Sequence, residues 1–135
     1  MRIGIYNHQH LRGGCPGCSQ IYVKGMISDG QKCQNRAISI YGQKCSFFHY
    51  TDLGDYPPHH LDRPGFMRMM KDVENHKLDA IFVLTLDKIS SKITLVLETY
   101  KKCKENNVAL MTATDGEKAI EILEKALNKI GRAHV

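Results

Sequence analysis

Ionisable side chains cluster where several hydrophobic runs of this 135-residue chain end. Arginine and lysine can stabilise the charge of a phosphoryl group, and an imidazole can accept or donate a proton. The sequence therefore predicts a site that grips a phosphate and moves protons around it, built from His8, His10, Asp52, Arg63, Asp87 and Lys88. The alternative is that the histidines are solvated and that the aspartates cap helices.

Regularly spaced apolar residues predict the elements that would position this site. Strands are expected near residues 2–6, 45–51, 79–86 and 108–114, and helices near 29–41, 64–74, 90–105 and 117–130. Asp29 is the expected cap and Gly42 the expected stop of the first helix. Glycines and prolines punctuate residues 8–30, which are predicted to be irregular.

Strand–helix units repeated four times predict an α/β fold with a mainly parallel sheet and helices on both faces. Ligands bind beyond the carboxyl ends of the strands in such sheets. The polar residues that follow the expected strands should therefore meet at one edge.

Composition narrows the class of protein. Hydrophobic residues make up 42% of the chain and charged residues 24%, which excludes a disordered chain, a collagen-like repeat and a coiled-coil rod. No apolar run approaches the roughly 20 residues that cross a bilayer, and no signal-peptide core is visible. We expect one domain over residues 1–135, soluble and cytoplasmic, with no membrane partner.

The net charge of +5 comes entirely from the first fifty residues, which hold six lysines and arginines against one acid. Residues 51–135 hold thirteen of each sign. This asymmetry indicates a polyanionic partner such as a nucleic acid, or else a basic face that aids solubility.

Five cysteines without a secretion signal argue against a disulfide framework. Cys15 and Cys18 have the spacing of a metal knuckle, and zinc could be held by the thiolates of Cys15, Cys18, Cys33 and Cys45. The alternative is four reduced thiols. No cofactor is expected, because Cys33 falls on an expected helix and Cys45 on an expected strand.

Three motifs resemble the catalytic domain of serine recombinases, the resolvases and invertases. These are Tyr50-Thr51-Asp52-Leu53-Gly54, Leu61-Asp62-Arg63-Pro64-Gly65-Phe66 and, after a hydrophobic strand, Leu86-Asp87-Lys88-Ile89-Ser90. The resemblance covers residues 1–7 and about 31–130. It implies a resolvase-like three-layer fold, and a site for DNA strand cleavage and rejoining that includes Tyr6, Asp52, Arg63 and Asp87.

The site departs from the family pattern where the chemistry would occur. The family's first strand ends in Tyr-x-Arg-x-Ser, and its serine attacks the DNA phosphate. Here Tyr6 is kept, His8 replaces the arginine and His10 replaces the serine. Lys88 and Ser91 replace two further arginines. The resemblance leaves His8, Arg63 and Lys88 to contact DNA.

The sequence therefore predicts a serine-recombinase-like domain that does not cut DNA. Weak, salt-dependent DNA binding is expected, as is association with a second copy or with a full-length recombinase. No separate DNA-binding domain is expected. Two alternatives stay open: a Cys/His-rich zinc-binding interaction module, and a phosphodiesterase that uses His8 and His10.

Overall fold

The computed structural model describes residues 1–9, 16–53, 63–90, 92–114, 120–126 and 128, with the backbone alone at 9, 16–27 and 53. Residues 120–126 are helical, and a 3-10 turn (η1, Leu86–Lys88) follows the third strand. The other elements are, in order, β1 (Arg2–Gln9), α1 (Pro16–Tyr41), β2 (Ser46–Leu53), α2 (Pro64–Glu74), β3 (Ala80–Val83), α3 (Ile93–Glu105) and β4 (Ala109–Thr112).

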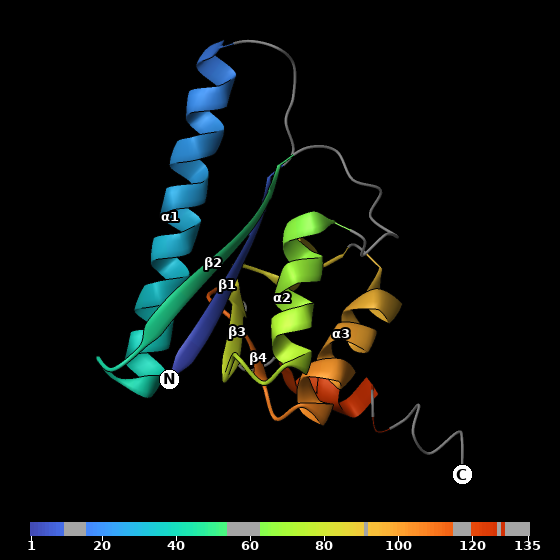
Figure 1. Cartoon of the computed structure of the whole chain (residues 1–135). Helices are drawn as coiled ribbons and strands as arrows, with labels where there is room; N and C mark the ends of the chain where they lie inside the picture. Colours follow the sequence, from blue (N-terminus) through green and yellow to red (C-terminus); the bar gives the residue numbers. More distant parts are fainter. Residues whose placement is uncertain (10–15, 54–62, 91, 115–119, 127, 129–135) are drawn as a thin grey trace.

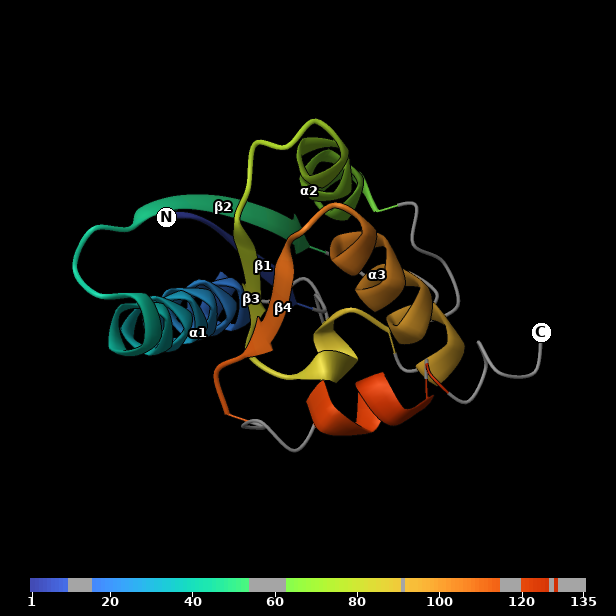
Figure 2. The same cartoon turned by 90° about the horizontal axis from the view of Figure 1, so that it is seen from below.

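The four strands form one sheet in the order β2-β1-β3-β4, and every neighbouring pair is parallel. From β1 the chain moves to one side to reach β2, then crosses back to β3 and β4 on the other side. Because crossovers are right-handed, this reversal puts α1 on one face and α2 and α3 on the other (Figures 1 and 2). The predicted parallel α/β architecture is confirmed.

Alternation along β1 and β3 divides the core between the two faces of the sheet. Ile3, Ile5 and Phe82 pack with Cys33 and Ala37 of α1. On the other face, Tyr6, Ile81 and Val83 pack against residues of α2 and α3. Both central strands are therefore covered on both sides, as their near-continuous apolar character requires.

The prediction of an irregular segment over residues 8–30 is wrong for most of its length. β1 continues to Gln9, and α1 begins at Pro16, so that Asp29 lies inside the helix and does not cap it. Proline is tolerated in the first turn of a helix, and an interior glycine costs only about 1 kcal/mol. The burial of Cys33 and Ala37 against the sheet offsets that cost.

The ends of the other elements differ less from expectation. Helix α2 spans 64–74 as predicted, and Gly42, with a φ of +87°, ends α1 by donating its N–H to the Ile38 carbonyl at 2.8 Å. The strand expected over 79–86 is shorter, because the chain turns into η1 soon after Val83. Of the helix expected over 117–130, the structure describes 120–126 and 128, and Leu123 packs in the core.

Candidate active site

Asp52 at the end of β2 caps the first turn of α2. Its Oδ1 accepts the Gly65 N–H at 2.7 Å, and its Oδ2 accepts the Phe66 N–H at 2.9 Å. The residue that precedes α2, Arg63, makes no side-chain cap of its own. A helix N-terminus presents unpaired N–H groups and a positive dipole end, so a carboxylate there is stabilising.

The same carboxylate also binds β1. The Tyr6 hydroxyl donates to Asp52 Oδ2 at 2.7 Å, and both side chains are buried. Asp52 is therefore fully engaged by three donors from β1 and α2. This arrangement gives Asp52 a structural role in joining three elements.

The close approach of α2 to β2 depends on Gly65. A Cβ atom on Gly65 would lie 2.6 Å from the Thr51 carbonyl oxygen and 3.0 Å from Asp52 Oδ1. Both distances are shorter than ordinary van der Waals contact. Glycine is thus the residue that lets the helix end reach the carboxylate.

Arg63 lies with its guanidinium inside the domain, and the residue is only 3% exposed. Nη1 donates to the Lys88 carbonyl at 3.1 Å, and Nη2 donates to the Ile89 carbonyl. The guanidinium carbon lies 5.4 Å from the centre of the Tyr6 ring and 4.9 Å from that of Phe66. Hydrogen bonds and aromatic faces thus compensate a charge that would be costly to bury alone.

His8 completes this buried group. Its Nδ1 lies 3.2 Å from Arg63 Nη1, and the residue is 7% exposed. His8 is also paired with Asp52 in the β1–β2 register. The group of Tyr6, His8, Asp52 and Arg63 stands at the carboxyl ends of β1 and β2, beside the point where the direction of strand order reverses.

The turn after β3 brings the remaining predicted residues to the same edge, but in a different way. Lys88 contributes its carbonyl oxygen to Arg63, and its side chain is half-buried. Asp87 is exposed and accepts a hydrogen bond from the Thr85 hydroxyl. His10 lies outside the described residues.

Sequence reasoning missed two residues that shape this site. The Phe66 ring covers the Arg63 guanidinium and meets the Tyr6 ring edge-on, with 5.3 Å between the ring centres. Gly65 admits Asp52 to the start of the helix. The Pro64-Gly65 pair at a predicted helix start was the available signal, because glycine in a first turn suggests close approach of another backbone.

Of the four candidate zinc ligands, the structure describes the side chains of Cys33 and Cys45. Cys33 is fully buried in α1, and burial raises the pKa of its thiol to about 12, which disfavours the thiolate that zinc needs. The half-buried Cys45 donates its thiol to the Gly42 carbonyl at 3.2 Å. Cys15 and the side chain of Cys18 lie outside the described residues, among which no group of three or more potential ligands occurs.

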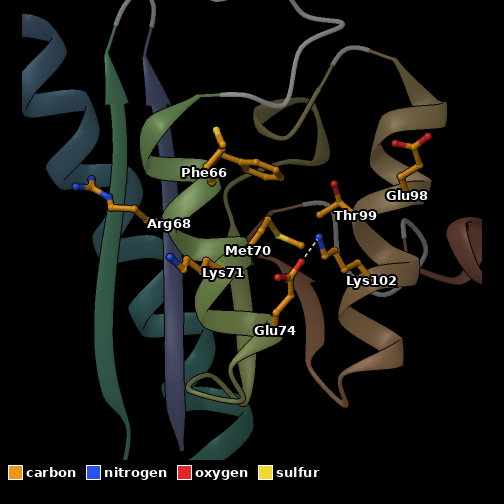
Figure 3. Close-up of a pocket in the computed structure, with 9 residues that line it drawn as sticks. Phe66, Arg68, Met70, Lys71, Glu74, Glu98, Thr99 and Lys102 are labelled. Carbon is orange, nitrogen blue, oxygen red and sulfur yellow. Dashed lines mark ion pairs between the residues drawn. The ribbon is translucent and has the colours of Figure 1, made fainter.

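A groove of about 540 Å³ lies between α2 and α3 (Figure 3). Phe66 and Met70 contribute its apolar lining, and an ion pair between Glu74 and Lys102 joins its two walls. None of the six predicted site residues that the structure describes lines this groove.

Comparison with known families agrees with the fold. Residues 28–132 match the family described as Resolvase, N terminal domain. The match spans more than half of the chain, and the chain therefore belongs to the resolvase N-terminal domain family of serine recombinases.

Solved structures share this fold at low sequence identity. The N-terminal catalytic domain of TP901-1 integrase is 21% identical, with a TM-score of 0.67 and 98% of each chain covered. A resolvase family site-specific recombinase from Streptococcus pneumoniae is 20% identical, with a TM-score of 0.68, 99% of this chain and 89% of that chain covered. The C-terminal catalytic domain of ISC1926 TnpA, an IS607-like serine recombinase, is 15% identical, with a TM-score of 0.66 and coverage of 96% and 80%.

One comparison and one structural observation are negative. No curated protein matches the chain. Within the described residues, no helix has the length and apolar character needed to traverse a membrane.

Proposed function

We propose that this chain is a serine-recombinase-type domain that associates with DNA or with recombinase subunits without cutting DNA. The observation that carries the proposal is the residue at position 10. Where the family pattern has the serine nucleophile, this chain has His10, which has no hydroxyl to form a phosphodiester with DNA.

The contacts of Arg63 support this proposal. The guanidinium is buried and donates to the carbonyls of Lys88 and Ile89 and to His8 Nδ1. Arginine binds phosphate best as a free planar fork. Both Nη atoms of Arg63 already donate within the domain, whereas Nε is buried with no hydrogen-bond partner among the described residues. Phosphate binding by Arg63 would first require these internal bonds to break.

Replacement of the other arginines weakens the site further. His8 is an imidazole and lacks the guanidinium fork, Ser91 has no charge, and Lys88 offers a point charge without the fork. Residues of a catalytic unit act together, and loss of a nucleophile alone costs about a millionfold in a well-studied protease. Restoring one residue should therefore not restore cleavage.

The proposal is tested by incubating the chain with supercoiled and linear duplex DNA and separating the products under denaturing conditions. We expect no covalent protein–DNA band from the wild-type chain, and none from His10→Ser. A control variant that combines His8→Arg, His10→Ser, Lys88→Arg and Ser91→Arg asks whether the full set of family residues suffices. A covalent band from the wild-type chain that disappears in His10→Ala would overturn the proposal.

DNA association is tested separately by titration of a fluorescent duplex at increasing salt. A basic surface without base-reading elements should bind DNA weakly. The logarithm of its binding constant should fall steeply and linearly with the logarithm of the salt concentration. Salt-independent binding to one sequence would contradict this part of the proposal. Sedimentation of the chain alone, and mixed with a full-length recombinase, then tests self-association and subunit binding.

A further inference from the structure

The contact between His8 and Arg63 defines the protonation state of the imidazole. His8 Nδ1 lies 3.2 Å from Arg63 Nη1, and both residues are more than nine-tenths buried. A guanidinium has five donors and no acceptor, so the imidazole nitrogen must be the acceptor. His8 is therefore neutral in this structure, with its proton on Nε2.

The same guanidinium holds the turn that follows β3. Arg63 donates to the carbonyls of Lys88 and Ile89, and the Ile89 side chain is fully buried in the core. Within the turn, the Lys88 N–H donates to the Thr85 carbonyl at 3.1 Å, and the Ile89 N–H donates to the Leu86 carbonyl at 3.0 Å. Arg63 thus ties the end of β1 to residues 86–89.

We infer that His8 and Arg63 form a proton-sensitive latch on the turn at residues 86–89. Neutral His8 accepts from Arg63 and helps to hold the guanidinium against the turn. A proton on Nδ1 removes the acceptor and places a second positive charge against the guanidinium. Arg63 then leaves His8, and its bonds to the turn carbonyls are disturbed.

Among the described residues, the charged and titratable groups beside His8, besides Arg63 itself, lie on β1, on β2 and in the turn after β3. Asp52, its neighbour on β2, would favour an imidazolium, but both Asp52 oxygens already accept bonds from Tyr6 and from the α2 backbone. Tyr6 shares the same face of β1. From the turn, Lys88 presents its carbonyl to Arg63, whereas the exposed Asp87 is bonded to Thr85.

The contact with Arg63 is made at the ring nitrogen itself, so a proton added at Nδ1 is placed directly against the guanidinium. Asp87 and Lys88 belong to the turn that the latch holds, so the protonation of one imidazole would reposition two candidate site residues. The inference concerns the protein alone and does not depend on whether the chain cuts DNA.

The test is a nuclear magnetic resonance titration of the full chain from pH 8 to pH 5. At pH 8, the ring nitrogens of His8 should show the tautomer with the proton on Nε2. As the pH falls, the amide signals of residues 88–90 should shift with the same midpoint as the His8 ring. The Arg63 Nε–H signal should follow them.

Two variants separate the latch from general effects of pH. His8→Gln, which cannot titrate, should abolish the shift at residues 88–90. The matched control is His49→Gln, because His49 is exposed on β2 and contacts Gln34 at 2.9 Å. In this variant the shift of the amide signals of residues 88–90 should persist.

Three results would overturn the inference. The first is an Nδ1–H tautomer at pH 8. The second is titration of the His8 ring without movement of residues 88–90, or the same movement in His8→Gln. The third is a His8 ring that stays neutral until the domain unfolds. Unfolding is detected in the wild-type chain by the loss of amide chemical-shift dispersion, so this result can be read even if His8→Gln does not fold.

Discussion

The Tyr6 hydroxyl donates to Asp52 Oδ2 at 2.7 Å. The two residues lie on neighbouring strands, and Asp52 is two positions beyond Tyr50, the residue that is paired with Tyr6. This bond links the end of β1 to the carboxylate that caps α2. Three elements that are distant in sequence thus share one buried acceptor. The candidate site is consequently also a structural junction of the fold.

Asp52→Asn should destabilise the domain by roughly 2–3 kcal/mol, because bonds to a charged acceptor are worth about 1.5–3 kcal/mol and buried donors would be left without partners. Urea unfolding followed by circular dichroism measures the change. Tyr6→Phe, which removes only one of the three donors, should cost about 1 kcal/mol.

Asp87→Asn is the matched control for this prediction, because Asp87 is exposed. Surface substitutions usually change stability by about 0.5 kcal/mol or less. Equal losses in Asp52→Asn and Asp87→Asn would contradict the structural role of Asp52.

Two glycine-to-alanine substitutions should change the free energy of unfolding in opposite directions. At Gly65 the new Cβ would meet the Thr51 carbonyl oxygen at 2.6 Å, and the loss should be about 1–3 kcal/mol, as in overpacked cores. At Gly30, inside α1, the nearest atom is Asn7 Nδ2 at 3.5 Å, and alanine should stabilise the helix by about 0.5–1 kcal/mol. Thermal unfolding of both variants checks the pair, and a stabilised Gly65→Ala would show that α2 does not approach β2 this closely.

Stability in acid should depend on the pair formed by Arg2 and Asp79. Hydrogen bonds from the Arg2 side chain and backbone N–H hold the pKa of Asp79 below its usual range. The unfolded carboxyl titrates near pH 3.9, so the contribution is present above that pH and is lost as the pH falls through the lower folded pKa.

The urea midpoint of unfolding should therefore fall less between about pH 5 and pH 3 in Arg2→Gln than in the wild-type chain. Both side chains are partly exposed, so the difference should be small and should shrink further in high salt. A fall of equal size in the wild-type chain and in Arg2→Gln would refute the assignment.

Two cysteines should resist alkylation in the native chain. Burial raises the pKa of the Cys33 and Cys103 thiols to about 12 each, so almost no thiolate exists at pH 8. Mass spectrometry after brief treatment with iodoacetamide should find both unmodified, and both modified once urea is added. Cys45, which is half-buried, serves as the internal reference and should react first. Rapid native labelling of Cys33 would indicate an open core and would favour the zinc alternative.

The fold was largely accessible from the sequence, for reasons that α2 and β3 illustrate. Pro64 marks the start of a helix, and the apolar run around residues 80–83 marks a strand covered on both faces. Helix α1 was predicted too short, because local rules treat Gly17 and Gly25 as breaks. Burial of Cys33 and Ala37 against β1 is a tertiary effect that no local pattern contains.

For the candidate site, the sequence was enough to predict its location but not its hydrogen bonds. Parallel strands bring their carboxyl ends to one edge, which was enough to expect Tyr6, His8 and Asp52 near one another. That Arg63 bonds inward to carbonyls of the turn depends on which backbone groups lie unpaired there. Such pairing depends on three-dimensional packing and cannot be predicted from the spacing of residues in the sequence.

The length of α1 has a mechanical consequence. Twenty-six residues make a helix of about 39 Å, whereas the eight residues of β1 extend only about 26 Å. The first turns of α1 therefore project past the carboxyl ends of β1 and β2, on the side where the candidate site lies (Figure 1). The side chains of Cys33 and Ala37 pack the later part of α1 against the sheet. Amide hydrogen exchange should be slow there, so that one element both supports the sheet and carries the backbone towards the candidate site.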